Sequence, residues 1–236
     1  MSEVIILAGG LGTRLRSVVA DVPKPLAPVA GRPFLEHLVD RWIAAGATRI
    51  VLSVGYRREL IERHFGDAYG GVPVDYAVEE RPLGTGGGLL LAAARLRGEG
   101  AFFAANGDTF FAVDVAAMRR AHEAKHADLT MALHQSTDRK RYTPVDLDAE
   151  GRIRTLRLER RAAPAWVNGG VYLIGRGVLE SAGLAGGSRV SLEDELLPVL
   201  LGRGARLVGF PSEAPFIDIG IPEDYARAGA VVAAAR

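Results

Sequence analysis

The feature that most constrains the fold is a glycine-rich turn close to the N-terminus, Leu7-Ala8-Gly9-Gly10-Leu11-Gly12-Thr13-Arg14-Leu15. The unbroken apolar run at residues 4–7 is typical of a strand buried on both faces of a parallel sheet. The glycines lack the Cβ atoms that would hold a ligand away from backbone N–H groups. Thr13 adds a hydroxyl donor, and Arg14 adds a permanent cation that grips phosphate through two parallel hydrogen bonds. The pattern predicts a phosphate-binding site formed by Leu7, Ala8, Gly9, Gly10, Gly12, Thr13 and Arg14.

The turn differs from two well-known nucleotide-binding signatures. A dinucleotide fingerprint requires a third Gly where this sequence has Leu15. A P-loop requires Gly-Lys followed by Ser or Thr, and the sequence contains no such run. The turn is followed instead by Pro23-Lys24-Pro25, in which two prolines hold the lysine in a nearly fixed backbone frame. Because a tight turn without a ligand needs neither an arginine nor a lysine, we prefer the phosphate-binding interpretation.

Composition excludes several classes of protein. With 48% hydrophobic residues among 236, the chain can bury a substantial core and is not disordered. The net charge of +1 gives no support for nucleic-acid binding. The absence of cysteine excludes disulfides, a thiolate nucleophile and cysteine zinc sites. We expect a cytoplasmic protein without membrane segments, because Met1-Ser2-Glu3 leads straight into a strand and no apolar stretch approaches the length of a membrane span.

Strand and helix patterns alternate through the first part of the chain. Apolar runs at 49–54, 72–78 and 101–105 predict strands. Helical patterns occur at 34–46, 85–96 and 115–125, and a charged amphipathic helix with Leu60, Ile61 and Phe65 inward ends near Gly66. This alternation predicts an α/β fold with a Rossmann-like, doubly wound, mostly parallel sheet. Ligands of such sheets bind at the carboxyl ends of the strands.

The pattern changes after residue 128. Strand-like runs at 129–133, 145–147, 153–158 and 167–174 are separated by polar turns, which suggests a small antiparallel sub-region. Short strands at 208–210 and 216–218 and a closing helix at 222–235 follow. We therefore expect one domain over 1–236. Its 1–127 part would carry the phosphate-binding turn and its nucleotide, and its 128–236 part would mainly carry a second substrate, with Asp218 returning toward the turn.

A second glycine-rich stretch, Pro82-Leu83-Gly84-Thr85-Gly86-Gly87-Gly88, opens the predicted helix at 85–96. Glycines at a helix N-terminus allow backbone N–H groups to approach an anionic ligand closely. In a loop, glycine alone is as often turn geometry. Its position after a strand, with Glu79 just upstream, favours a ligand contact.

Two aspartates provide a candidate metal site. Asp108 follows the predicted strand at 101–105, in Asn106-Gly107-Asp108, and Asp218 lies inside an apolar strand where an unpaired charge would be costly. Mg²⁺ is normally held by one or two carboxylates together with phosphate oxygens. The two aspartates can share one such ion.

Two further patterns receive structural interpretations. His122 and His126 lie four residues apart in a predicted helix, but charged neighbours favour an exposed helix face over a metal pair. Ser191, followed by three acidic residues, is expected to cap a helix N-terminus.

Taken together, these motifs resemble the signature of the sugar-1-phosphate nucleotidyltransferases. The resemblance extends over almost the whole chain, through the turn at 7–15, Pro23-Lys24-Pro25 and the stretches at 82–88, 106–108, 168–172 and 216–225. Within the family it is greatest to the D-glycero-D-manno-heptose 1-phosphate guanylyltransferases, on residues 15–19, 32–36, 106–109 and 216–225.

The resemblance implies a role for each matching residue. Arg14 and Lys24 would bind the reacting phosphates, and Asp108 and Asp218 would hold Mg²⁺. The remaining nucleotide contacts would come from Glu79, Pro82, Gly84, Thr85, Asn106 and Gly107, and the sugar phosphate would contact Glu159, Arg160, Asn168, Gly169 and Gly170. The sequence departs from the family at Arg160, where a lysine is usual, and Arg161 beside it is an alternative contact.

The implied reaction is transfer of a nucleotidyl group from a nucleoside triphosphate to a sugar 1-phosphate with release of pyrophosphate. A phosphate oxygen is already ionised at neutral pH, so no general base is required. Glu79 favours GTP, because guanine offers two adjacent donors to one carboxylate. Uridylyl-, thymidylyl- and mannose-1-phosphate guanylyltransferases, and an inactive nucleotide-sugar-binding subunit, are the alternatives. A Rossmann oxidoreductase is disfavoured by Leu15, and a homo-oligomer is compatible with the sequence.

Overall fold

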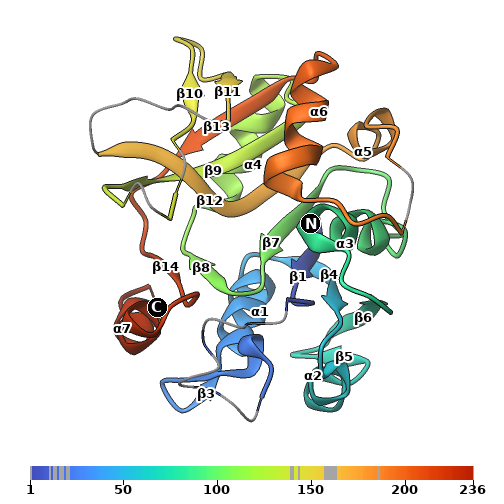
Figure 1. Ribbon diagram of the computed structural model, residues 1–236, viewed down its shortest axis with the longest axis vertical. Helices are drawn as coiled ribbons and strands as arrows, with labels where there is room; N and C mark the ends of the chain where they lie inside the picture. The colour runs from blue at the N-terminus through green and yellow to red at the C-terminus, as the bar shows by residue number, and fades with distance from the viewer. Residues whose placement is uncertain are drawn as a thin grey trace.

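An eight-stranded sheet runs through the whole molecule (Figure 1). The computed structural model describes residues 2–10, 12, 15, 19, 22–138, 141–142, 144–156, 164–184 and 187–235. In spatial order the strands are β13 (Leu207–Pro211), β9 (Leu129–Ser136), β12 (Ala165–Ile174), β7 (Phe102–Asn106), β1 (Ser2–Leu7), β4 (Ala47–Val54), β6 (Val72–Val78) and β5 (Ala68–Tyr69). All run in one direction except β12 and β5. The predicted α/β class with a mostly parallel sheet is confirmed.

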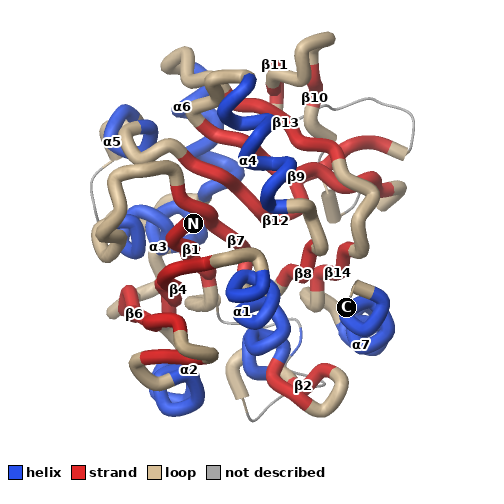
Figure 2. The backbone as a smooth tube through the Cα atoms, turned by 180° about the vertical axis from the view of Figure 1, so that it is seen from behind, coloured by secondary structure: helices blue, strands red, loops and turns tan. Residues whose placement is uncertain are grey.

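Helices cover both faces of the sheet (Figures 1 and 2). Alternate residues of β1 supply two separate cores: Val4 and Ile6 face one, and Ile5 faces the other. The first core also receives side chains from α1 (Phe34–Ala44), α2 (Arg58–Phe65), α4 (Val115–Ala124) and α7 (Pro222–Ala234). The second receives them from α3 (Gly84–Ala93), α5 (Val178–Ser181), the π-helix η3 (Leu192–Leu196) and α6 (Leu197–Gly202).

The strands after residue 128 differ from the expected antiparallel sub-region. β9, β12 and β13 extend the main sheet, and only β12 runs antiparallel to its neighbours there. A small antiparallel pair, β10 (Asp146–Leu147) with β11 (Ile153–Thr155), lies outside the main sheet. Strands buried on both faces show the same continuous apolar pattern in either direction, so the sequence pattern does not reveal strand direction.

Three short elements shape the edge at which the parallel strands end. β8 (Thr109–Phe111) pairs antiparallel with β14 (Phe216–Asp218), which brings two distant parts of the chain together. A hairpin of β2 (Pro28–Val29) and β3 (Arg32–Pro33) follows the 3₁₀ turn η2 (Lys24–Leu26). Because β1, β4, β6 and β7 are parallel, their carboxyl ends meet at this edge.

The expectation that His122 lies on an exposed helix face is wrong. Its side chain is buried, and its Nδ1 lies 2.9 Å from the Thr130 hydroxyl of β9. Burial lowers the pKa of His122 below its ordinary value. Charged neighbours in sequence occupy other sides of the helix and do not report the side that packs on the sheet. In the described part of the chain, no helix is long and apolar enough to cross a bilayer.

Candidate active site

A first cavity of about 410 Å³ opens where the parallel strands end. It brings together nearly all residues that the sequence predicts to bind nucleotide. Its lining includes Leu7, Ala8, Gly9, Gly10, Gly12, Lys24, Glu79, Pro82, Gly84, Thr85, Asn106, Gly107 and Asp108, together with Pro25, Arg189 and Gly220. Two other predicted contacts, Thr13 and Arg14, lie outside the described residues. The sequence analysis did not identify Arg189.

The glycines of the first turn serve close packing as well as ligand access. A Cβ on Gly9 would lie 2.3 Å from Glu79 Oε1, so the Glu79 carboxylate occupies the space that a side chain at position 9 would take. Gly12 has a φ of +57°, and a Cβ there would lie 2.7 Å from Lys24 Cβ. By contrast, a Cβ on Gly10 would meet nothing within 4 Å. Of Gly9, Gly10 and Gly12, only Gly10 thus has open space beside its backbone.

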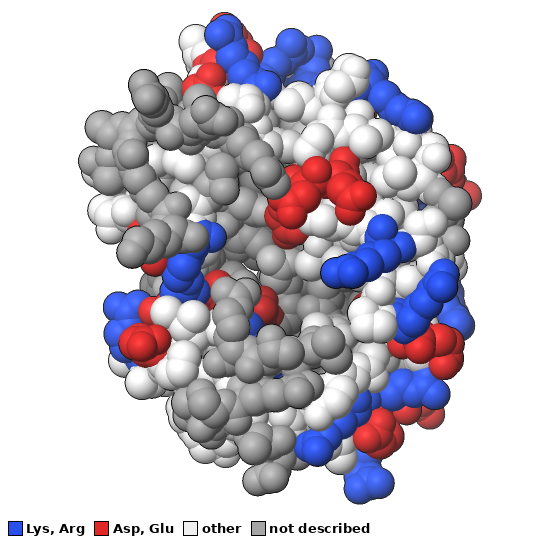
Figure 3. Space-filling view, in the orientation of Figure 1, with Lys and Arg blue, Asp and Glu red and all other residues white. Residues whose placement is uncertain are grey.

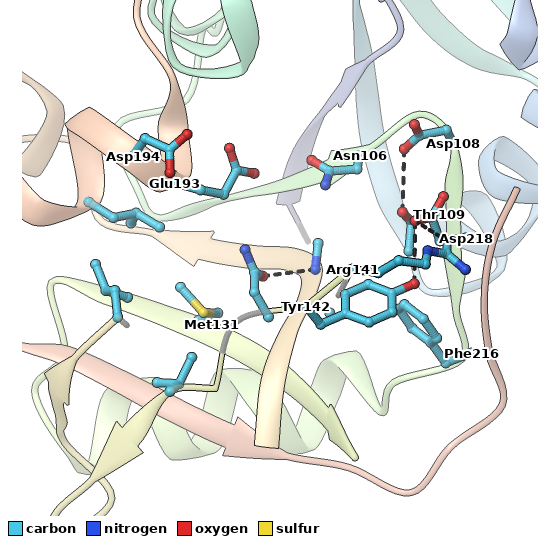
Figure 4. A pocket seen from close by; sticks show the side chains of 16 residues that line it. Asn106, Asp108, Thr109, Met131, Arg141, Tyr142, Glu193, Asp194, Phe216 and Asp218 are labelled. Carbon is cyan, nitrogen blue, oxygen red and sulfur yellow. Dashed lines mark hydrogen bonds and ion pairs between the residues drawn. The ribbon is translucent and has the colours of Figure 1, made fainter. Parts of the chain in front are cut away.

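A second cavity of about 280 Å³ adjoins the first (Figure 4). The predicted residues Asn168, Gly169 and Gly170 line it, whereas Glu159, Arg160 and Arg161 lie outside the described residues. Five polar residues that were not predicted as site residues also line it: Thr109, Arg141, Tyr142, Glu193 and Asp194. Asn106 and Asp108 line both cavities, so the two spaces share a wall.

Lys24 and the two predicted metal-binding aspartates meet at this shared wall. Lys24 Nζ lies 2.6 Å from Asp108 Oδ2 and 4.0 Å from Asp218 Oδ1. The pairing of β8 with β14 explains the proximity, because Asp218 is the register partner of Thr109 and Ile219 N donates to the Asp108 carbonyl at 3.0 Å. The two carboxylates thus share a cation although they lie far apart in sequence.

Arg141 and Tyr142 hold the opposite side of Asp218. Arg141 Nη2 and the Tyr142 hydroxyl donate to Asp218 Oδ2 at 2.9 and 3.3 Å (Figure 4). Gly220 N donates to Oδ1 at 2.7 Å. Arg141 also pairs with Asp224 at the start of α7. Burial raises the pKa of Asp224, but hydrogen bonds from Arg141 and Arg227 outweigh this and leave it below its ordinary value.

The start of α3 corrects the expectation that its N–H groups face a ligand. Gly86 N and Gly87 N both donate to the carbonyl of Val190, at 2.9 and 3.1 Å, and Val190 N donates back to the Leu83 carbonyl. A Cβ on Gly84 would lie 2.6 Å from Val190 O, and one on Gly87 would lie 2.6 Å from Ser188 O. The glycines therefore let the segment 188–192 cap the helix, although Gly84 and Thr85 still line the first cavity.

The two neighbouring glutamates after β6 have different surroundings. Glu79 lines the first cavity, and its carboxylate accepts hydrogen bonds from Ser53 Oγ and Leu83 N, both at 2.9 Å. Glu80 is 85% exposed and faces Arg58. Each Glu79 oxygen can accept a second hydrogen bond, so the carboxylate retains capacity for a ligand.

Ser191 caps a helix as the sequence predicts. Its hydroxyl accepts from Asp194 N at 3.0 Å at the start of the π-helix η3. π-helical turns are rare and occur frequently at functional sites. Across the described residues, no three His, Asp or Glu side chains form a metal-ligand cluster, so a metal here would rest on the aspartate pair and on ligand oxygens.

Comparison with known proteins agrees with this geometry. Residues 3–234 match the family described as nucleotidyl transferase. The chain is 38% identical over 226 residues to D-glycero-alpha-D-manno-heptose 1-phosphate guanylyltransferase of Aneurinibacillus thermoaerophilus, with 96% of both chains covered. It is 36% identical over 232 residues to mannose-1-phosphate guanylyltransferase of Mycobacterium tuberculosis, with 97% of this chain and 64% of that protein covered.

A solved structure gives the same result. The crystal structure of HddC from Yersinia pseudotuberculosis complexed with GMP-PN has a TM-score of 0.83 and 33% identity, over 98% of this chain and 99% of that one. Sequence and structure therefore agree over nearly the full length of the chain. The resemblance inferred from its motifs is confirmed, and the chain belongs to the nucleotidyl transferase family.

Proposed function

We propose that this protein transfers the guanylyl group of GTP to D-glycero-D-manno-heptose 1-phosphate, giving the nucleotide sugar and pyrophosphate. The observation that carries the proposal is the cluster of Lys24, Asp108 and Asp218 at the wall shared by two cavities. Transfer of a nucleotidyl group from one substrate to another requires two adjoining binding sites. Charged groups that neutralise the phosphates are needed at the point where the two sites meet. The names of the heptose and mannose guanylyltransferase relatives support the choice of base and sugar.

In this proposal, the first cavity receives GTP and the second receives the sugar 1-phosphate. A sugar phosphate oxygen attacks the α-phosphorus in line, the bond from that phosphorus to the β-phosphate oxygen breaks, and pyrophosphate leaves with the electron pair. The attacking oxygen is already ionised, so the residues contribute position and positive charge rather than proton transfer. Lys24 would release Asp108 and contact the reacting phosphates, and Arg14 would hold the triphosphate.

The residues at the shared wall fit a magnesium ion. Asp108 and Asp218 both face the Lys24 ammonium, at 2.6 and 4.0 Å, and this arrangement of two carboxylates around one positive charge supports the proposal of a metal ion held by the same pair. Oxygen ligands from one or two carboxylates together with phosphates are the usual magnesium set. When bound, Mg²⁺ would neutralise triphosphate charge there. Arg141 holds Asp218 from the side away from Lys24, so the carboxylate is already oriented.

GTP would bind the 1–127 part of the chain, and the sugar 1-phosphate would bind mainly the 128–236 part. We also predict a cytoplasmic location, which cell fractionation would test, and a homo-oligomer, which light scattering would test. Glu79 would read guanine, and Glu159, Arg160 and Asn168-Gly169-Gly170 would bind the sugar phosphate. Mannose 1-phosphate is the second candidate acceptor, because the Mycobacterium tuberculosis relative bears that name.

A pyrophosphate-release screen tests the proposal. GTP, UTP, dTTP, ATP and CTP are each combined with heptose, mannose and glucose 1-phosphates in the presence of Mg²⁺. We expect the highest kcat/KM for GTP with the heptose 1-phosphate. Preference for mannose 1-phosphate would select the second candidate, and no release with any pair would indicate a nucleotide-sugar-binding subunit without catalysis.

A further inference from the structure

One segment of the chain contacts both cavities. Arg189 lines the first cavity, Glu193 lines the second, and Val190 between them is fixed to the start of α3 by three backbone hydrogen bonds. Acidic side chains gather on the face beside α6 (Figure 3), and Figure 4 shows Glu193 next to Asp194 in the wall of the second cavity. Glu193 is therefore carried into the second cavity by a firmly anchored segment.

Hydroxyl groups hold the Glu193 carboxylate in place. Thr85 Oγ1 donates to Oε2 at 2.8 Å, and the Tyr172 hydroxyl donates to Oε1 at 3.4 Å. Thr85 in turn accepts from Leu192 N at 2.9 Å, and Tyr172 accepts from Asn168 Nδ2 at 2.6 Å. Burial raises the pKa of Tyr172 well above its ordinary value, so this phenol keeps its proton and remains a donor.

The charge of Glu193 has no cationic counterpart in the described part of the chain, where no Lys or Arg lies within ion-pair distance of its carboxylate. Each oxygen accepts one hydroxyl hydrogen bond there, and a carboxylate oxygen can accept two. The carboxylate thus has the chemistry to accept further O–H donors from a molecule in the second cavity. A sugar presents several such donors, whereas its phosphate would be repelled by the negative charge.

We propose that Glu193 is a specificity-determining residue that accepts hydrogen bonds from hydroxyl groups of the sugar 1-phosphate. Thr85 and Tyr172 are positioning residues that hold its carboxylate. This assignment rests on the proposed function, because it takes the second cavity as the sugar subsite. It also orients the substrate, with the sugar ring toward η3 and the phosphate toward Asp108 and Lys24.

Steady-state kinetics with Glu193→Gln test the proposal. The acceptor is whichever of the heptose and mannose 1-phosphates the wild type turns over in the screen. Because hydrogen bonds to charged groups are about twice as strong as neutral ones, we expect its KM to rise roughly tenfold or more, with the KM for GTP within about twofold of wild type. Glu195→Gln removes the same charge from an exposed position on η3 that lines neither cavity, and should leave both constants unchanged.

The positioning role has its own test. Thr85→Val should raise the KM for the sugar 1-phosphate, and Thr85→Ser, which keeps the hydroxyl, should restore it. Glu193→Asp, which withdraws the carboxylate by one methylene, provides a second variant, and thermal melting confirms that each variant is folded.

Three outcomes would overturn the assignment while wild-type turnover stands: an unchanged sugar KM in folded Glu193→Gln, an equal rise in the KM for GTP, or the same rise in Glu195→Gln. A wild type that releases no pyrophosphate with any substrate pair would instead overturn the proposed function.

Discussion

Lys24 Nζ lies 2.6 Å from Asp108 Oδ2, in a pair whose lysine side chain is only 11% exposed. The lysine thereby compensates a carboxylate that would otherwise face a second one, Asp218, without a cation between them. A triphosphate that binds beside this wall brings negative charge of its own. The Lys24 ammonium must therefore leave the Asp108 carboxylate to contact the phosphate oxygens.

Loss of either aspartate charge should abolish most turnover. Asp108→Asn and Asp218→Asn keep the side-chain shape but remove the carboxylate, and we expect kcat to fall by about two decades or more. Turnover should also stop with excess chelator. Asp67→Asn, at an exposed position outside both cavities, is the matched control. Near-normal turnover of Asp108→Asn would contradict the role of the aspartate pair.

Glu79 should control the choice of base. A bidentate base contact is worth about 1–3 kcal/mol, or roughly tenfold to a hundredfold in kcat/KM, so GTP should exceed UTP and dTTP by that margin. Glu79→Gln should relax this preference, because an amide can also donate to a base carbonyl. Its oxygen can still accept from Leu83 N while its amide faces Ser53 Oγ, so the fold should be retained. Glu80→Gln, on the exposed side, should leave base preference unchanged.

Arg160 should act on the sugar phosphate. Arg160→Ala is expected to raise the KM for the sugar 1-phosphate, whereas GTP binding measured calorimetrically without sugar should barely change. Arg161→Ala is the comparison variant. A larger loss in Arg161→Ala would assign the phosphate contact to Arg161 instead.

Gly87 should be intolerant of a methyl group. A Cβ there would lie 2.6 Å from Ser188 O and 2.8 Å from Leu83 Cβ, so Gly87→Ala overpacks the contact between α3 and the capping segment. We expect a loss of about 1–2 kcal/mol in the free energy of unfolding, because the strain exceeds the gain in helix propensity. Gly202→Ala, at the end of α6 with nothing within 4 Å of the added Cβ, should be neutral or slightly stabilising in the same urea titration.

His134 should make stability depend on pH. Burial lowers the pKa of His134 to about 4, so the unfolded chain binds this proton more readily between pH 6.5 and 4. Stability is therefore lost as the pH falls through that window, by up to about 3 kcal/mol at 1.36 kcal/mol per unit. His134→Phe keeps an aromatic ring against Phe216, whose centroid lies 3.6 Å from that of His134, and should lower the slope. Identical slopes for both proteins in urea titrations would refute the prediction.

The sequence predicted the features that depend on local pattern. The buried strand, the glycine-rich turn, the Ser191 cap and the position of Asp108 after a strand all follow from neighbouring residues. Contacts between distant segments were not accessible in this way. The backbone hydrogen bonds between Val190 and the start of α3 join residues about a hundred positions apart. Arg141 contacts Asp218 and Asp224, which belong to β14 and α7, so these contacts depend on how those elements pack.

The same limit explains the errors. The N–H groups of Gly86 and Gly87 bond to Val190 rather than face a ligand, whereas Gly84 and Thr85 line the first cavity. A sequence does not distinguish a glycine required by packing from one required by a ligand. The buried side of His122 was missed because the helix packs that side on Thr130 of β9, whereas its charged sequence neighbours suggested a solvent-exposed face.

The pairing of β8 with β14 also determines when Asp108 and Asp218 come together. Asp108 leaves the ribosome well before Asp218, and the two meet only when residues 216–218 pair with 109–111. A chain that ends before β14 therefore contains Asp108 without the second carboxylate. If Asp218 holds the metal as proposed, a chain that ends before β14 would lack the second carboxylate of the site and should be inactive rather than merely less active.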